Sequence, residues 1–254
     1  MGKWGICHIC GEETQLTYEH VPPRAAFNDK PIVLANIEKI FSADDIEVLD
    51  TPRGRVNQKG AGAYTLCSTC NNNTGAWYGN AFVDWTYQGL TLSDHVLQAP
   101  SLYHIFRIFP LRVIKQVLCM FFSANGDRFH EVHQDLVRLV LNRLDNGLHP
   151  RIRIYTFLNT SSRFRQTGIS GLMTFDGGHK LFSEIASFPL GYVMTINSPP
   201  PDPRLVDISF FANCRFNDWK DIPLRLPILP VYTAFPGDYR PRDEIAPLLQ
   251  RNEN

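Results

Sequence analysis

The stretch Leu-Cys-Ser-Thr-Cys-Asn-Asn-Asn-Thr-Gly at residues 66–75 contains the second of two Cys-x-x-Cys pairs in the chain. The pairs are Cys7 with Cys10 and Cys67 with Cys70. Four thiolates in two such pairs suit a tetrahedral structural zinc and leave no ligand position open for chemistry. A disulfide framework is the alternative, but this spacing is more typical of metal, and the sequence starts without a secretory signal. We therefore expect the four cysteines to hold one Zn²⁺.

Between the two pairs lies Tyr-Glu-His-Val-Pro-Pro-Arg at residues 18–24. Together with Cys-His-Ile-Cys-Gly at 7–11 and the stretch at 66–75, it resembles the HNH endonuclease superfamily. More narrowly, the three segments look like the zinc-bound branch, in which an acid-His-x-x-Pro segment precedes Cys-x-x-Cys-Asn. The likeness covers residues 5–82. Each piece alone is weakly specific, whereas their order, with Asn directly after the last Cys, is specific.

The resemblance implies a ββα-metal site, in which a β-hairpin and a following helix hold one divalent cation. His20 matches the general base that takes a proton from the attacking water, a role that suits a side chain with a pKa of about 6.5. Glu19 and Asn71 match the two protein ligands of the cation. Their oxygen atoms suit Mg²⁺ or Mn²⁺ better than Zn²⁺. Arg24 is placed to contact a phosphate oxygen. The implied reaction is hydrolysis of phosphodiester bonds in DNA, with RNA as the alternative substrate.

The chain departs from the family pattern between His20 and the second cysteine pair, where the sequence is long for a simple hairpin. The family has a middle Asn that helps to orient the base, and Gly62 stands at its usual position. Asn57 or Gln58 could serve if the hairpin is longer. A further helix ligand of some relatives is replaced by Gly75, although Asn73 could be recruited. A weakened or inactive nuclease is therefore an alternative.

Each site residue also has an ordinary structural interpretation. His20 could be a strand or loop histidine, Asn71 could cap a helix, and Glu19 could be solvated. The alternative function is a catalytically silent zinc-ribbon module that binds nucleic acid or protein. The joint order of the three segments favours the nuclease.

The charge of the chain gives no general attraction to nucleic acid, because 25 Lys and Arg balance 25 Asp and Glu among its 254 residues. Nucleic-acid binding would need a local basic patch. The candidates are Arg24, Arg53, Arg55 and Lys59. Three of them lie in the glycine-rich segment 51–62, where backbone N–H groups could approach a phosphate closely. An ordinary mobile loop is the alternative interpretation of this segment.

The expected fold class is α+β, with an HNH unit at residues 1–85 followed by a helical and then β-rich region at 86–254. The second region carries no recognisable catalytic motif, so we expect it to sense, to dock a protein partner or to form a homo-oligomer. The hydrophobic patterns predict helices at 70–88, 110–124 and 130–143, and strands near 151–158, 169–175, 184–188, 191–196 and 207–211.

Two further cysteines, Cys119 and Cys214, have no patterned partner. We expect both to be free thiols in a reducing cytoplasm. The Asp-Gly-Gly-His sequence at 176–179 looks like a turn before it looks like a metal site. No stretch reaches the eighteen or more apolar residues needed to span a bilayer, so no contact with membrane is expected.

Overall fold

The computed structural model describes residues 3–34, 54–93, 99–173 and 178–245. It contains both helices and strands, in agreement with the expected α+β class. The part formed by residues 3–34 and 54–79 is called the head below, and residues 99–245 are called the sheet half. The helix α4 (Asn80–Ser93) connects them.

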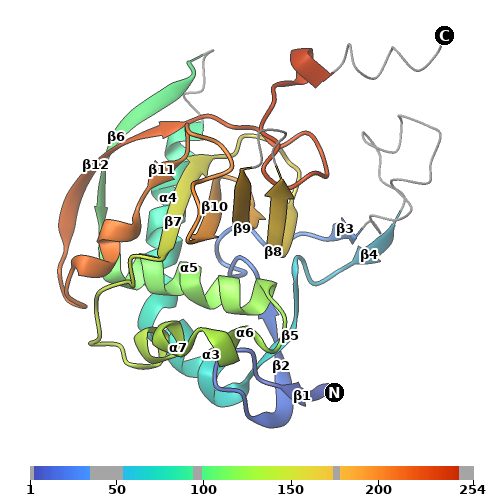
Figure 1. Ribbon diagram of the computed structural model, residues 1–254, viewed down its shortest axis with the longest axis vertical. Helices are drawn as coiled ribbons and strands as arrows, with labels where there is room; N and C mark the ends of the chain where they lie inside the picture. Colours follow the sequence, from blue (N-terminus) through green and yellow to red (C-terminus); the bar gives the residue numbers. More distant parts are fainter. Residues whose placement is uncertain (1–2, 35–53, 94–98, 174–177, 246–254) are drawn as a thin grey trace.

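The head is built on a three-stranded sheet in the order β1-β2-β5. The strands are β1 (Lys3–Ile6), β2 (Glu13–His20) and β5 (Gly62–Cys67). Strand β2 pairs with β5 in antiparallel register, and the helix α3 (Ser68–Thr74) begins directly after β5. Between β2 and β5, the described residues form a separate two-stranded ribbon of β3 (Ile32–Leu34) and β4 (Arg55–Asn57), which lies beside the three-stranded sheet in Figure 1. This ribbon explains why the connection is too long for a simple hairpin.

Helix α3 continues through a π-helical turn, η1 (Gly75–Gly79), into α4, where the sequence predicts a helix at 70–88. Its buried residues recur every three or four positions, as a helix with one face on the core requires. They include Thr74, Tyr78, Phe82 and Trp85. The indole N–H of Trp85 donates to the hydroxyl of Tyr192 at 2.9 Å, which joins α4 to the sheet half.

Helix α5 (Pro110–Ala124) lies at the centre of the molecule, and all but two of its fifteen residues are buried. Its bounds match the predicted helix, because Pro110 occupies the first turn and most of the residues that follow it are apolar. The helix predicted at 130–143 is instead two short helices, α6 (Phe129–Val132) and α7 (Gln134–Leu141). His133 between them has φ −128° and ψ 48°, outside helical geometry.

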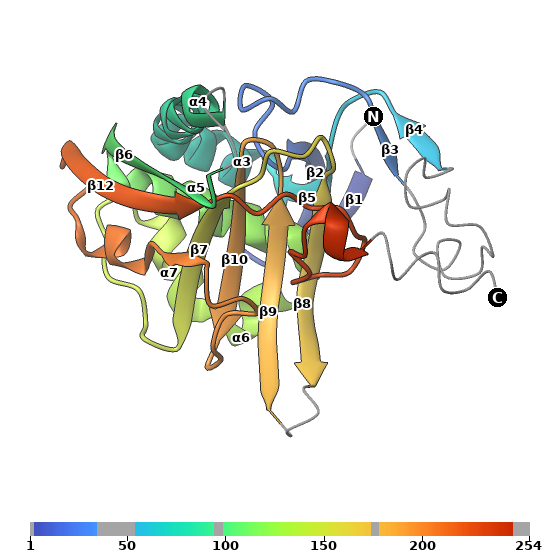
Figure 2. The same cartoon turned by 90° about the horizontal axis from the view of Figure 1, so that it is seen from above.

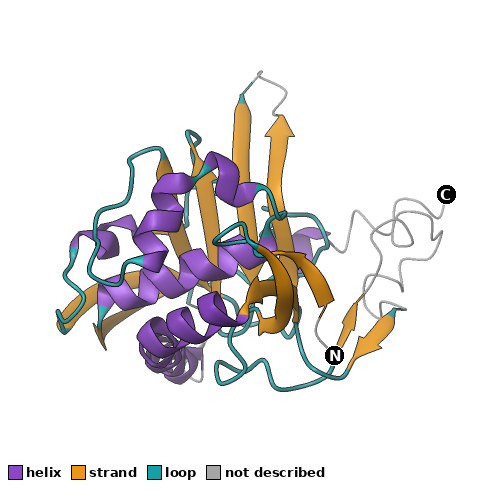
Figure 3. Cartoon of the chain, turned by 90° about the horizontal axis from the view of Figure 1, so that it is seen from below, coloured by secondary structure: helices purple, strands orange, loops and turns teal. Residues whose placement is uncertain are grey.

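The sheet half contains a five-stranded sheet in the order β11-β7-β10-β9-β8, in which every neighbouring pair is antiparallel. Helices α5 to α7 cover one face of it (Figure 3). Leu229, Val231 and Tyr239 of the C-terminal segment pack with buried residues of the sheet, in a second core. Its strands are β7 (Ile152–Leu158), β8 (Arg165–Met173), β9 (His179–Ala186), β10 (Leu190–Ile196) and β11 (Val206–Asp207).

Four of the predicted strands correspond to β7, β8, β9 and β10. The strand predicted at 207–211 is wrong, since β11 ends at Asp207 and is followed by a 3₁₀ helix, η2 (Ser209–Asn213). The carboxylate of Asp207 accepts the N–H of Ser209 at 2.7 Å, and the Ser209 hydroxyl accepts the N–H of Ile154 at 2.9 Å. These bonds turn the chain out of the sheet.

A second, two-stranded sheet has no counterpart among the sequence predictions. It pairs β6 (Ser101–Ile108) with β12 (Lys220–Pro227), and both strands lie at one margin of the molecule (Figures 1 and 2). The boundary predicted at residue 85 falls inside α4, and one continuous core contains buried residues from Cys7 to Leu226. The division into two domains stays a prediction. Among the described residues, no helix is long and apolar enough to cross a membrane.

Candidate functional site

The four patterned cysteines converge in the head. Cys7 and Cys10 lie in the turn after β1, Cys67 ends β5, and Cys70 is in the first turn of α3. Their sulfur atoms all lie within 4.8 Å of one another. The Cys10 and Cys67 sulfurs are 3.9 Å apart, whereas a disulfide needs about 2.05 Å. A tetrahedral zinc with Zn–S bonds of about 2.3 Å requires sulfurs about 3.8 Å apart, so the cluster fits such an ion.

Hydrogen bonds and burial shift the pKa values of the thiols in this cluster in opposite directions. A hydrogen bond with the Cys70 thiol lowers the pKa of Cys7 to about 4. Burial raises the pKa of Cys10 to about 12, and the hydrogen bond with Cys7 raises the pKa of Cys70. Four thiolates so close together repel one another, and a divalent cation among them would supply the compensating charge. The chemistry of the donor set therefore suits zinc.

The cysteine cluster is attached to the end of α5. The Nδ1 atom of His8 lies 3.1 Å from the carbonyl oxygen of Phe122, to which it can donate. The hydroxyl of Thr65 donates to the hydroxyl of Ser123 at 3.0 Å. The imidazole of His130 occupies the space where a Cβ at Gly11 would lie, and Gly11 has φ +77°. The cysteine cluster is therefore a junction between the head and the sheet half.

Glu19 and Asn71 lie on the helix side of β2. The Nδ2 of Asn71 donates to the hydroxyl of Thr17 at 2.9 Å, and Thr17 is two residues before Glu19 on the same strand face. Burial raises the pKa of Cys119 in α5, and the charge of Glu19 raises it further, so Glu19 lies near this helix. Burial raises the pKa of Glu19 to about 7. In the described part of the chain, no ion pair joins Glu19 to a cation.

His20 follows Glu19 at the end of β2, so its side chain points to the opposite face of the strand. Its ring packs edge-to-face with that of Tyr18, with ring centroids 5.0 Å apart. Its Nε2 lies 2.9 Å from the carbonyl oxygen of Lys59. A carbonyl oxygen only accepts, so Nε2 carries the proton and Nδ1 keeps a lone pair. Burial lowers the pKa of His20, and the charges of Arg24 and Lys59 lower it further. These effects favour the neutral imidazole, in which Nδ1 can accept a proton.

Asn57 holds the turn that carries this carbonyl. Its Oδ1 accepts the N–H of Lys59 at 3.2 Å, and its Nδ2 donates to the carbonyl of Gly60 at 2.8 Å and to the hydroxyl of Tyr18 at 2.9 Å. A Cβ at Gly62 would overlap the carbonyl oxygen of Glu19, so an asparagine does not fit there. Of the two residues considered from the sequence, Asn57 is the one that supports the histidine.

Two of the four predicted basic residues lie near His20. Arg24 is exposed, and its charge and that of Lys59 both act on the imidazole. The ammonium of Lys59 is 5.1 Å from the centroid of the Tyr18 ring. Arg55 is exposed on β4, farther along the ribbon, and Arg53 lies outside the described residues. Among the described residues, Arg24 and Lys59 are the members of the predicted patch that lie near the end of β2.

The other candidates give no second site. Cys119 and Cys214 are buried, free thiols, as expected from the sequence. Asp176 lies outside the described residues, and His179 is exposed at the start of β9. Among the described residues, the four cysteines form the one cluster of three or more Cys, His, Asp or Glu side chains suited to a metal.

No protein-family model matches this chain, and neither a curated protein nor a solved structure is detectably similar to it. The class of this protein can therefore be described only from its fold and its candidate site. The chain is a mixed α and β protein with a four-cysteine cluster that could bind a metal such as zinc.

Proposed function

We propose that the chain is a metal-dependent endonuclease of the HNH class that hydrolyses phosphodiester bonds in DNA. The observation that carries this proposal is the 2.9 Å hydrogen bond between His20 Nε2 and the Lys59 carbonyl. It sets the tautomer that a general base needs, at the strand position where the family resemblance expects one. The order β2, β5, α3 also supports the proposal, because it is the order of a ββα unit.

The proposed chemistry begins with a water molecule beside His20. Nδ1 of His20 takes a proton from this water as it attacks the phosphorus atom, and the Lys59 carbonyl stabilises the positive charge that forms on the imidazole. Arg24 and Lys59 contact the phosphate oxygens. Their charges hold the substrate close to the base and offset the negative charge that develops on the phosphate. The attack breaks the bond between phosphorus and the 3′ oxygen, and this oxygen takes a proton from solvent water. The products are a 5′-phosphate and a 3′-hydroxyl, as the family resemblance implies.

Glu19 and Asn71 are the proposed ligands of a Mg²⁺ or Mn²⁺ ion. Glu19 is a carboxyl group whose pKa burial raises to about 7, and it lacks an ion pair in the described part of the chain. Asn71 donates to Thr17 through Nδ2, so its Oδ1 is the atom available to a cation. When bound, the ion would stabilise charge on the scissile phosphate and on the departing oxygen. The cysteine cluster, in contrast, has a structural role.

We propose that the protein works in a reducing compartment such as the cytoplasm, because none of its six cysteines forms a disulfide. A formal net charge of zero means that DNA is attracted only by the local patch. Binding should therefore be weak and sensitive to salt. Bacterial defence or a mobile element is the setting that the family resemblance suggests.

The test is cleavage of supercoiled plasmid by the wild-type protein and by His20→Ala, with Mg²⁺ or Mn²⁺ and with EDTA. The zinc content of each protein is measured first. We expect metal-dependent nicking that falls by about 10² to 10⁴ in His20→Ala, the usual contribution of a general base. His149→Ala is the matched control, because His149 is exposed on a loop of the sheet half. Equal nicking by wild type and His20→Ala would refute the assigned base.

A second variant tests whether the turn held by Asn57 positions His20. Asn57→Ala should lower kcat with little change in KM, because Asn57 holds the Lys59 carbonyl without touching the proposed substrate. RNA is tested as a substrate under the same conditions. If the wild-type protein binds DNA but cleaves neither plasmid nor RNA, we would conclude that the chain is a catalytically silent zinc-ribbon module.

A further inference from the structure

The β6–β12 sheet has an outer face that no described element covers. Side chains alternate along a strand, so every second residue of β6 and of β12 points to this side. The residues between them, such as Phe106 and Ile222, are buried. The outer face consists of Tyr103, Ile105 and Arg107 from β6 and Asp221, Pro223 and Arg225 from β12, and all six are exposed.

These six residues form three rows across the two strands. Arg107 lies opposite Asp221, Ile105 opposite Pro223, and Tyr103 opposite Arg225. Successive rows are about 7 Å apart, since they are two residues apart along each strand. The middle row is apolar, and the exposed Tyr103 ring and the Trp219 indole, 59% and 53% exposed, extend the apolar surface toward the two ends.

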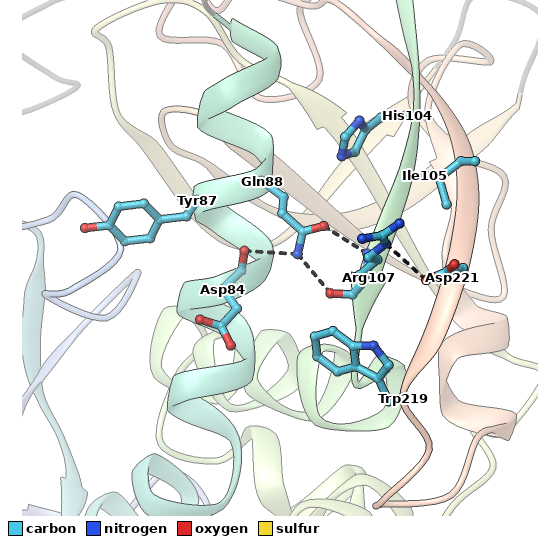
Figure 4. Close-up of a pocket in the computed structure, with 8 residues that line it drawn as sticks. All are labelled: Asp84, Tyr87, Gln88, His104, Ile105, Arg107, Trp219 and Asp221. Carbon is cyan, nitrogen blue, oxygen red and sulfur yellow. Dashed lines mark hydrogen bonds and ion pairs between the residues drawn. The ribbon is translucent and has the colours of Figure 1, made fainter.

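The two ends of the face carry opposite charge. Arg107 and Asp221 form an ion pair at 3.6 Å, and Figure 4 shows this pair beside Trp219. Asp84 of α4 lines the same end and adds a second carboxylate. At the other end Arg225 stands alone, and neither Asp84 nor Arg225 has an ion pair among the described residues. The face thus combines an acidic end, an apolar middle and a basic end.

The free edge of β6 is occupied beside this face. The side-chain oxygen of Gln88 accepts the N–H of Arg107 at 2.9 Å, and its Nε2 donates to the Arg107 carbonyl at 2.9 Å (Figure 4). Gln88 therefore satisfies the backbone groups that a further strand would need at this position. Lateral extension of the sheet is blocked there, which leaves the face as the surface open to a partner.

We propose that this face binds a second copy of the same chain. In the proposed dimer, the outer faces of the two sheets face each other. The two-fold axis lies in the plane between them, runs perpendicular to the strands and passes through the row of Ile105 and Pro223. This arrangement sets β6 against β6 and β12 against β12, with the order of the rows reversed. Asp221 of one protomer then faces Arg225 of its partner, and this pair occurs twice. Arg107 faces the ring of Tyr103 in the same way.

The affinity of this dimer follows from the size of the face. Three rows on two strands bury less than the roughly 800 Å² per partner of a standard interface. The dimer should therefore dissociate on dilution, and the two rim ion pairs should set its specificity more than its strength. The inference is independent of the proposed nuclease activity, because no residue of the face belongs to the head.

The experiment is sedimentation equilibrium of the full chain over a wide range of concentration. We expect a monomer–dimer equilibrium for the wild-type protein. Asp221→Arg alone and Arg225→Asp alone should each weaken the dimer by about tenfold or more, because each puts like charges opposite one another twice. An equimolar mixture of these two variants should recover the dimer, because one protomer then has only cations at these positions and its partner only anions.

Asp127→Arg, a charge reversal at an exposed residue between α5 and α6, is the control and should dimerise like the wild type. Circular dichroism and zinc content confirm that each variant is folded. A wild-type protein that stays monomeric at every concentration would overturn the proposal. So would a dimer that both reversals leave unchanged, or a mixture that dimerises no better than its components.

Discussion

The head and the sheet half are stabilised by different forces. In the sheet half, six of the seven residues of β10 are buried, so the packing of apolar side chains holds the strand in place. In the head, only one of the eight residues of β2 is buried. The head relies instead on its cysteine cluster and on side chains that bond the backbone.

Asn28 illustrates how the head is held together. It is 6% exposed, and its Nδ2 donates to the carbonyls of Pro22 and Ala61 at 2.7 and 2.6 Å. Its Oδ1 accepts the N–H of Ala61 at 2.6 Å. Such bonds fix the segments that lie on both sides of His20. The proposed chemistry thus lies in the part of the molecule that contains the cysteine cluster, and we expect this part to depend most on a bound metal.

The largest effect expected from this comparison is that of metal removal. Cys70→Ala should release the zinc and abolish protection of the β2 and β5 amides against hydrogen exchange, because a structural zinc contributes about 10 kcal/mol or more to folding. The amides of β10 should remain protected. Cys214→Ala, which removes a buried thiol outside the cluster, is the control and should keep its zinc. Equal loss of protection in β2 and β10 would show that the two parts are a single cooperative unit.

A cavity in the sheet half should have the converse effect. Ile154 in β7 is 0% exposed, and Ile154→Ala should lower the free energy of unfolding by about 2 to 5 kcal/mol while the zinc content stays the same. Urea titration followed by fluorescence measures the change. Val33→Ala, at a half-exposed position on β3, should change it by less than about 0.5 kcal/mol. Loss of zinc from Ile154→Ala would break the distinction between the two parts.

The buried Lys115 gives the sheet half a pH dependence of its own. Lys115 is 0% exposed, its ammonium donates to the carbonyls of Asn142 and Arg143 at 2.8 and 3.2 Å, and burial lowers its pKa to about 8. Between pH 8 and the unfolded pKa of about 10.4, the unfolded chain binds more protons than the folded one. Stability should therefore rise with pH across this window, by up to about 3 kcal/mol.

Lys115→Met should remove this rise, because methionine does not titrate. The measurement is urea unfolding of both proteins at several pH values within the window. The difference between the two proteins isolates Lys115 from other titrating groups. Parallel pH profiles would mean that the ammonium is solvated in the folded protein.

The smallest of these effects concerns the contact between α4 and the five-stranded sheet. Tyr192→Phe removes the acceptor of the Trp85 N–H, which leaves a buried donor without a partner. We expect a loss of about 1 to 3 kcal/mol in the free energy of unfolding, measured by thermal or urea denaturation. Tyr87→Phe, at a half-exposed position on the same helix, should be nearly neutral. A neutral Tyr192→Phe would indicate that water replaces the hydroxyl.

The elements that the sequence predicts best are those fixed by local signals. Helix α5 begins with Pro110, continues through mostly apolar residues and is followed by Asn125 and Gly126, so both of its ends are visible in the sequence. Strands β6 and β12 were missed because their pairing joins residues more than a hundred positions apart. Pro223 and Pro227 in β12 also argue locally against a strand. The break at His133 is a change of backbone conformation that no residue type there requires.

In the candidate site too, some features can be predicted from the sequence and others require the structure. The four cysteines were found from their spacing alone, and the structure brings all four together. The support of His20 was only partly visible, because its partner is a main-chain carbonyl and any residue can supply one. Asn57 was one of two candidates, and the choice between them required the turn at residues 57–60. The catalytic roles themselves stay predictions.

The most direct test of the central claim is anomalous scattering from a crystal of the protein grown with Mn²⁺, collected at the zinc and manganese absorption edges. The account predicts two separate peaks. A zinc peak should lie among the sulfurs of Cys7, Cys10, Cys67 and Cys70, and a manganese peak should lie between Glu19 and Asn71. A zinc peak without manganese at Glu19 would contradict the proposed catalytic metal, and disulfide-bonded cysteines would contradict the structural one.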